Sequence, residues 1–133
     1  MAADTQVLFN GNNRYVVKLM NFDGTAESDV VKVDISTLIG PDGKTVPTSF
    51  SVEGILYDVQ GFSAVKLEFD ASTDDPFAVL SLAGYMDLRG VGGIIDPKSS
   101  GYTGDILLTT VAADSGYDGT ETYDITLFLR KRQ

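Results

Sequence analysis

The chain has 133 residues, with 19 acidic and 10 basic side chains and a formal net charge of −9. It contains no His, Cys or Trp, and 43% of its residues are hydrophobic. The length and apolar fraction predict one globular domain. The missing residue types exclude Ser-His-Asp triads, imidazole bases, thiolate nucleophiles, disulfides, and metal sites built from His or Cys. The composition therefore favours a protein that is not an enzyme and carries no cofactor.

The acidic balance of the chain bears on its partners. Binding to a nucleic-acid backbone needs clustered Lys and Arg, and here three of the ten bases, Arg130, Lys131 and Arg132, stand together near the end. We expect a solvated basic end, with pairing to an acidic surface as the alternative. No apolar run approaches the ~20 residues of a membrane span, and the first residues lack the pattern of a secretory signal. These features predict a protein that folds in a cytoplasm and binds neither nucleic acid nor membrane.

The first segment, residues 1–13, has one apolar triplet, Val7-Leu8-Phe9, between polar or Gly-containing flanks. Such a segment cannot form a strand pair alone. It predicts an extended N-terminal arm that lies on its own domain, adds to the edge strand of a neighbour, or stays disordered.

The remainder, residues 14–133, is predicted as one β domain, because alternation of apolar and polar residues with period two recurs along it. Val31, Val33 and Ile35 are expected to share an inner face, and Gly54 predicts a bulge or a close approach of another backbone. Expected strands cover residues 14–20, 31–35, 50–57, 65–70, 77–82, 106–111 and 123–129.

The separators between these strands are typical of turns. Asp23-Gly24 predicts a tight turn joining the first two strands of this domain, and residues 40–43 predict a second turn. The best helical candidate is a single turn near residues 36–39. This pattern predicts an all-β fold: a single-domain antiparallel β-sandwich with an N-terminal arm, with the jelly roll as one form and a barrel as the alternative.

A Gly-rich stretch over residues 84–104 is predicted as one long connection. Its apolar side chains favour a partner surface, although the loop could instead fold back over the end of the sandwich and cover the core. These apolar residues are Tyr85, Met86, Leu88, Val91, Ile94 and Ile95.

Two acidic loops contain carboxylates of the kind that bind calcium. Residues 114–121 place carboxylates near glycines, but their spacing does not fit an EF-hand, and Asp-Gly loops commonly serve as turns. Asp70, Asp74 and Asp75 form the second loop, to which the same argument applies. The sequence therefore predicts no metal site, no cofactor site and no catalytic residue.

Four segments carry a resemblance to a known family: residues 14–36 (RYVVKLMNFDGTAESDVVKVDIS), 88–95 (LRGVGGII), 103–110 (TGDILLTT) and 121–131 (ETYDITLFLRK). In this order they resemble small virion structural proteins of tailed bacteriophages. Residues 41–46 look like an insertion relative to that pattern. The family has no active-site residues to transfer.

The resemblance implies a structural viral protein located in the virion, made in the host bacterial cytoplasm. The favoured role is a capsid decoration (cement) protein that stabilises the bacteriophage head by bridging capsid subunits. The alternatives are a head–tail connector or tail component, and a small carbohydrate-binding β-sandwich. Expected partners are the major capsid protein or other virion proteins, with the chain as a homo-oligomer. The candidate partner-binding residues are Val7, Leu8, Phe9, Tyr85, Met86, Leu88, Val91, Ile94, Ile95, Arg130, Lys131 and Arg132.

Overall fold

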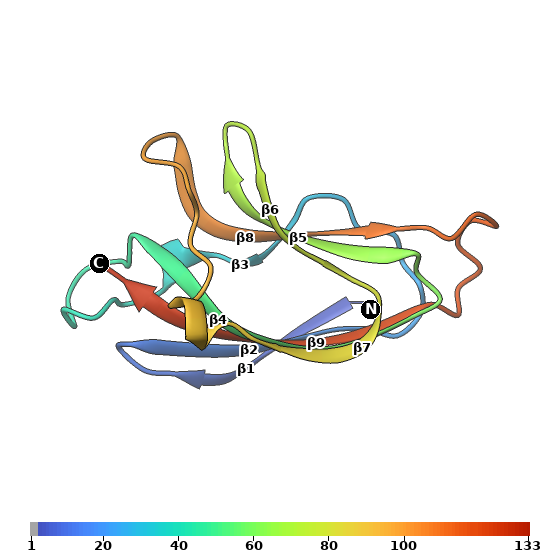
Figure 1. Cartoon of the computed structure of the whole chain (residues 1–133), viewed down its shortest axis with the longest axis horizontal. Helices are drawn as coiled ribbons and strands as arrows, with labels where there is room; N and C mark the ends of the chain where they lie inside the picture. The colour runs from blue at the N-terminus through green and yellow to red at the C-terminus, as the bar shows by residue number, and fades with distance from the viewer. Residues whose placement is uncertain (1–2) are drawn as a thin grey trace.

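The computed structural model describes residues 3–133 as two antiparallel β-sheets stacked as layers (Figure 1). The order of the five-stranded sheet, sheet A, is β1-β2-β9-β4-β7, and that of the four-stranded sheet, sheet B, is β3-β8-β5-β6. The strands are β1 (Ala3–Asn10), β2 (Arg14–Asn21), β3 (Val30–Val33), β4 (Ser49–Gln60), β5 (Ala64–Ala71), β6 (Asp75–Leu80), β7 (Leu82–Asp87), β8 (Tyr102–Val111) and β9 (Thr122–Arg132).

Strands β2 to β9 form four nested antiparallel pairs: β2 with β9, β3 with β8, β4 with β7, and β5 with β6. Nested pairs describe one long hairpin. The hairpin is rolled up, because β4 also pairs with β9 and β5 with β8. Two sheets of four strands wound in this way make a jelly roll, to which β1 is added as an extra edge strand. The all-β sandwich expected from the sequence is confirmed in its jelly-roll form.

The core lies between the sheets and follows the period-two pattern. On β9, Tyr123, Ile125, Leu127 and Leu129 are buried while Asp124 faces out. Burying one such side chain contributes about 1.5–3 kcal/mol. The core also includes, from β2 and sheet B, Tyr15, Val17, Leu19, Val65, Leu67, Phe69, Ile106 and Leu108.

Gly54 has both features that the sequence predicted for it. Strand β4 shifts register against β9 between Val52 and Gly54, which is a bulge. A Cβ atom at position 54 would lie 2.9 Å from the Tyr85 hydroxyl and 3.3 Å from the Phe128 ring. The missing side chain therefore leaves room for two aromatic residues that pack edge to face.

Two local predictions for β3 and its approach are wrong. Val31 is 48% exposed rather than inner, because a register shift between Val31 and Val33 changes the face that it occupies. The side chain of Lys32 is instead only 6% exposed and forms an ion pair with Glu27. Gly24 has the positive φ of a turn, but residues 22–29 cross between the sheets, since β2 and β3 do not pair.

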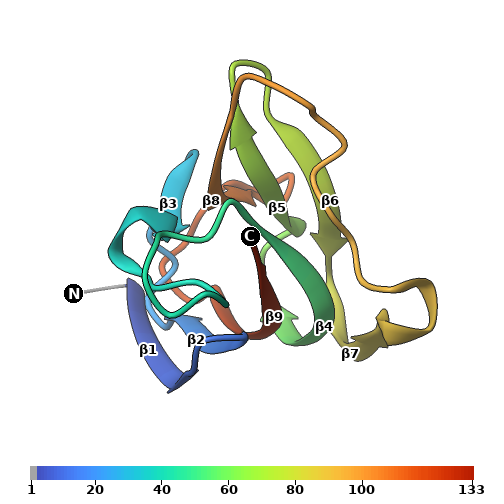
Figure 2. The ribbon, with the colours of Figure 1, turned by 90° about the vertical axis from the view of Figure 1, so that its left-hand side faces the viewer.

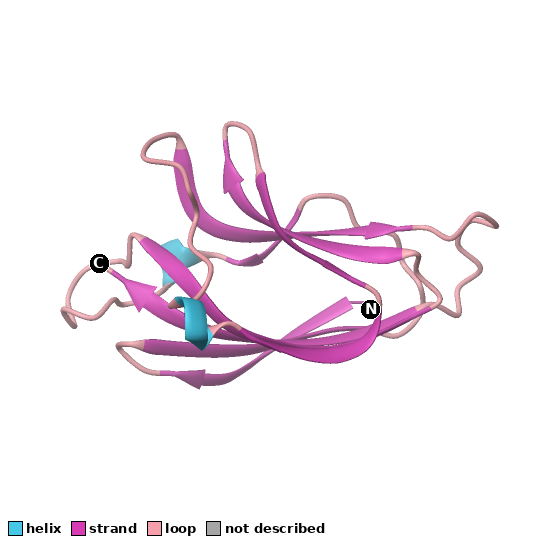
Figure 3. Cartoon of the chain, viewed as in Figure 1, coloured by secondary structure: helices cyan, strands magenta, loops and turns pink. Residues whose placement is uncertain are grey.

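The helical content is two short turns of 3-10 helix in the described residues (Figure 3). The first, η1 (Ile35–Thr37), lies near the single turn expected at 36–39, and the side chain of Asp34 caps it. The second, η2 (Arg89–Val91), lies in the Gly-rich stretch. That stretch is shorter than predicted: β7 occupies its first residues, so the connection runs from 88 to 101. This strand was not predicted because Gly84 is typical of a loop. The Tyr57 hydroxyl occupies the space that a Cβ atom at position 84 would need.

Of the three arrangements expected for residues 1–13, the structure has the first. Residues 3–10 pair with β2 as the outer strand of sheet A (Figure 2). Met1 and Ala2 lie outside the described residues. The segment is thus an integral edge strand, joined to β2 by a turn in which the Gly11 amide donates to the Arg14 carbonyl.

Candidate functional site

The apolar triplet of β1 is exposed at an open sheet edge. Val7, Leu8 and Phe9 are 50%, 50% and 56% exposed, respectively. Strand β1 ends the order of sheet A, so within residues 3–133 its second edge pairs with no strand. A register shift between Val7 and Phe9 interrupts the ladder to β2. Asp4 is the only charged residue in β1, so this edge has little of the charge that usually protects edge strands.

The basic end is not the solvated tail that was expected, because residues 130–132 belong to β9. Lys131 is only 4% exposed. Its Nζ donates to the Asn10 side-chain oxygen at 2.8 Å and to the Ile39 carbonyl at 2.7 Å, and burial lowers its pKa. Lys131 therefore holds the end of β1 to the roll and is not available to a partner.

The two flanking arginines have different surroundings. Arg130 lies on the outer face of sheet A with its Nε 3.9 Å from a carboxylate oxygen of Glu53, which also forms an ion pair with Arg14. Arg132 is exposed and lies beside Ser49. Both remain accessible, and Arg130 is partly neutralised within the chain.

The apolar residues of the Gly-rich stretch divide into two groups. Met86, Leu88 and Ile94 pack against the core, and Ile94 forms a β-bridge with Val52. For these three residues the second expectation is confirmed, since they cover the core. The outward group is exposed by 44% or more and consists of Tyr85, Val91 and Ile95.

The candidate partner-binding residues do not form one surface. The β1 triplet and Tyr85 lie on the two opposite outer strands of sheet A, β1 and β7. An open groove of about 360 Å³ lies between them on the outer face of this sheet. Leu56 and Ala83 line it together with Asp58, Asp124 and Lys18, and Lys18 Nζ lies 3.2 Å from Asp124. No local pattern predicted this groove, because its lining comes from four separate strands.

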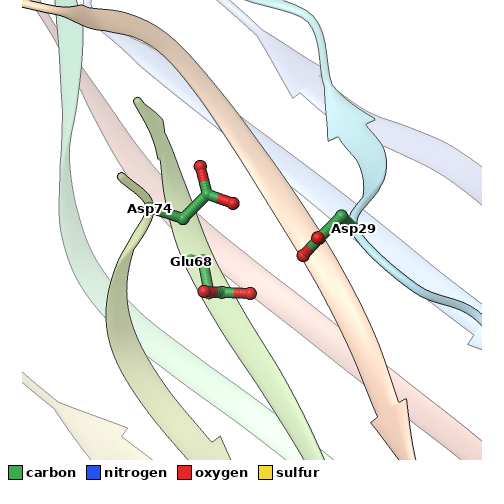
Figure 4. A group of neighbouring side chains, drawn as sticks. All are labelled: Asp29, Glu68 and Asp74. Atoms are coloured by element: carbon green, nitrogen blue, oxygen red, sulfur yellow. The ribbon is translucent and has the colours of Figure 1, made fainter. Parts of the chain in front are cut away.

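An acidic cluster on sheet B brings together Asp29, Glu68 and Asp74, whose carboxylates face a common space (Figure 4). One oxygen from each residue lies within 4.8 Å of the other two. Asp29 precedes β3, Glu68 lies in the middle of β5, and Asp74 lies in the turn between β5 and β6. Desolvation raises the pKa of Glu68, and the charge of Lys66 partly opposes this.

The cluster overlaps only partly with the acidic loops seen in the sequence. The second acidic loop contains Asp70, Asp74 and Asp75, and only Asp74 belongs to the cluster. Asp70 accepts a hydrogen bond from Thr103, and Asp75 pairs with Lys98. Nothing in the local sequence marked Glu68 or Asp29, since Glu68 was one of several outward charges on an alternating strand.

The loop at residues 114–121 behaves as a turn. Asp118 accepts hydrogen bonds from the backbone amide and hydroxyl of Thr120. Glu121 accepts from the backbone amides of Asp118 and Gly119. Both carboxylates therefore accept hydrogen bonds from groups of their own loop, which is the arrangement expected for a turn.

Comparisons with known proteins add little. No protein-family model matches the chain, and no curated protein matches it. Among solved structures, a cupin domain from Bordetella pertussis Tohama I is similar with a TM-score of 0.39 and 8% identity, over 99% of this chain and 95% of that chain. A similarity this weak carries no argument about function. No helix in the described residues is long and apolar enough to cross a bilayer.

Proposed function

We propose that this protein is a structural virion protein, a decoration (cement) protein that binds the bacteriophage head and stabilises it by bridging capsid subunits. The observation that carries the proposal is the open β1 edge with its half-exposed apolar triplet. An open edge offers backbone donors and acceptors to an extended segment of another chain, and the adjacent apolar side chains add burial on contact. The resemblance of residues 14–36 and 121–131 to virion proteins supports the same role.

The packing of β1 fits such a contact. No residue from 4 to 10 belongs to the buried core, so a partner can use this edge without disturbing the roll. The proposed partner is the major capsid protein or another virion protein, with the chain present as a homo-oligomer on the head. The proposed location is the assembled virion.

Occupancy on the particle tests the proposal. In the double variant Val7→Asp/Phe9→Asp, two charges replace the apolar contact, and we expect the protein to be absent from purified heads. The matched control is Val79→Asp, which changes a 68% exposed residue on β6, the edge strand of sheet B. Circular dichroism should show that both variants keep the β fold.

Normal occupancy of Val7→Asp/Phe9→Asp on the head would contradict the use of β1. Copy number separates the roles within the virion. Many copies spread over the shell support decoration, whereas a few copies on the tail axis would show a connector or tail component instead.

A further inference from the structure

We propose that Asp29, Glu68 and Asp74 bind a divalent cation of the calcium type on the outer face of sheet B. The cluster and the β1 edge lie on different sheets, so this inference does not depend on the proposed function.

The spacing of the three carboxylates suits one ion. Calcium is bound by carboxylate and carbonyl oxygens at about 2.3–2.6 Å, so two oxygens on opposite sides of an ion are about 4.6–5.2 Å apart. The three cluster oxygens all lie within 4.8 Å of one another. They can therefore reach a common ion without movement of the strands, and water can complete the coordination shell.

The independent observation is the state of the Glu68 side chain. Glu68 is only 5% exposed, and its Oε1 is buried without a hydrogen-bond partner among the described residues. A buried carboxylate oxygen with no partner is costly, because it has lost its water. Figure 4 shows this carboxylate together with those of Asp29 and Asp74 at the corners of a shared space. A cation in the shared space would supply the partner that the chain does not.

Lys66 does not replace such a cation. Its Nζ lies 3.5 Å from Glu68 Oε1, which is longer than a normal N–H···O hydrogen bond. The Lys66 side chain is 36% exposed, and it offers one positive charge beside three carboxylates. Because it is long and partly solvated, it can move toward water when an ion binds.

The other two ligands are held in place by their second contacts. Asp29 Oδ1 accepts a hydrogen bond from the Thr109 hydroxyl at 3.1 Å, and the Asp29 amide donates to that same hydroxyl at 2.9 Å. Asp74 Oδ1 accepts from the Ala71 amide at 3.0 Å. Each contact engages one oxygen of its carboxylate and leaves the other for an ion. Such preorganisation lowers the cost of binding.

Calcium titration of the intact protein tests the site. In metal-free buffer, added Ca²⁺ should raise the Tm in a saturable way, since a ligand that binds only the folded state stabilises it. Isothermal titration should give one ion per chain, with saturation by about 10⁻⁴–10⁻³ M, the range of extracellular calcium modules. Mg²⁺ should give a smaller shift, because it demands closer and more regular ligands.

Isosteric variants locate the ion. Glu68→Gln and Asp74→Asn should abolish the calcium-induced shift, while Asp114→Asn, in the exposed acidic loop, should keep it. Lys66→Met should bind calcium several-fold more tightly, because a competing positive charge is removed. The proposal would be overturned by a wild-type Tm that does not respond to Ca²⁺, by an equal or larger shift with Mg²⁺, or by an unchanged shift in Glu68→Gln.

Discussion

The β1 edge of sheet A and the acidic cluster of sheet B depart from ordinary packing in opposite ways. At β1, the apolar side chains of Val7, Leu8 and Phe9 are exposed, although burial would stabilise them. In the cluster, the Glu68 carboxylate is buried, although solvent would stabilise it. The β1 edge would be stabilised by an apolar surface or an added strand. The acidic cluster would be stabilised by a positive charge.

The residues that stabilise the fold and the residues that could contact a partner or an ion lie in different parts of the chain. The inner faces of the eight-stranded roll supply the core, and β1 adds no side chain from residues 4–10 to it. Sheet B carries part of this core on one face and the acidic cluster on the other. A substitution beneath the cluster should therefore affect folding far more than one at the β1 edge.

The largest effect is expected for Leu108→Ala. Leu108 is fully buried on β8. Its neighbour Leu107 pairs with Glu68 of the cluster, and its other neighbour, Thr109, donates a hydrogen bond to Asp29. Removing its side chain should cost about 2–5 kcal/mol, because a cavity remains. Urea unfolding measures this loss. A cost below about 1 kcal/mol, closer to that of a surface substitution, would show that sheet B packs loosely.

The second effect concerns the tie between β1 and the roll. Lys131→Met leaves the Asn10 side-chain oxygen and the Ile39 carbonyl without their donor. We expect a loss of about 1–3 kcal/mol and faster amide hydrogen exchange in β1. Arg132→Met, at an exposed neighbouring position, is the control and should change stability little. Unchanged exchange in Lys131→Met would show that β1 is held by its ladder to β2 alone.

A third, smaller effect is a pH dependence at Asp96, in the connection between η2 and β8. Burial raises the pKa of Asp96, and the nearby Asp75 carboxylate adds to the rise. Its Oδ2 is buried without a hydrogen-bond partner in the described residues. A raised acid pKa means that the folded protein holds the proton more tightly than the unfolded chain. The protonated Asp96 carboxyl therefore stabilises the fold at low pH. This stabilisation is lost as the pH rises from 3.8, the ordinary pKa of Asp, through the raised pKa of the folded protein.

Asp96→Asn keeps the group neutral at every pH and places an amide donor where Oδ2 lies. At neutral pH we expect the free energy of unfolding of the variant to be about 1 kcal/mol higher than that of the wild type. This difference should shrink as the pH falls toward the ordinary pKa range of Asp. Unfolding in urea across this range is the measurement, with Asp114→Asn as the control. A difference that stays constant with pH would refute the assignment to the Asp96 proton.

The smallest effect is expected at the β1 edge itself. Phe9→Ala should change stability by no more than about 0.5 kcal/mol, since the side chain is 56% exposed and lies outside the core. Urea unfolding next to Leu108→Ala gives the direct contrast between the two regions. A loss above ~1 kcal/mol would mean that β1 is part of the folding core, which would weaken its assignment as a partner surface.

Much of the fold was predictable because local patterns encode it. Alternation located β2, β5 and β9, short apolar runs located β6 and β8, and Gly54 correctly indicated a bulge and a close contact. The failures have local physical causes. The bulge at β3 turned Val31 outward, and Gly84 concealed β7 because a tyrosine from β4 fills its missing side chain.

The candidate sites were predictable to different degrees. The β1 triplet is contiguous, so its apolar character was visible without a structure. The acidic cluster joins residues 29, 68 and 74, of which only Asp74 stood in a marked acidic loop. Lys131 was expected in solvent because a run of three bases usually is, and its burial depends on Asn10 and Ile39 from distant segments.

Composition and side-chain alternation were enough to indicate an all-β protein with a single core, no His or Cys chemistry, and an exposed-looking apolar segment near its start. The jelly-roll nesting of the strands, the role of that segment as an edge strand, and the meeting of Asp29 with Glu68 and Asp74 became visible in the three-dimensional fold alone. The physical reason is the range of the interactions. Side-chain alternation is set by neighbouring residues, whereas the rolling of one long hairpin brings together positions whose proximity no local pattern records.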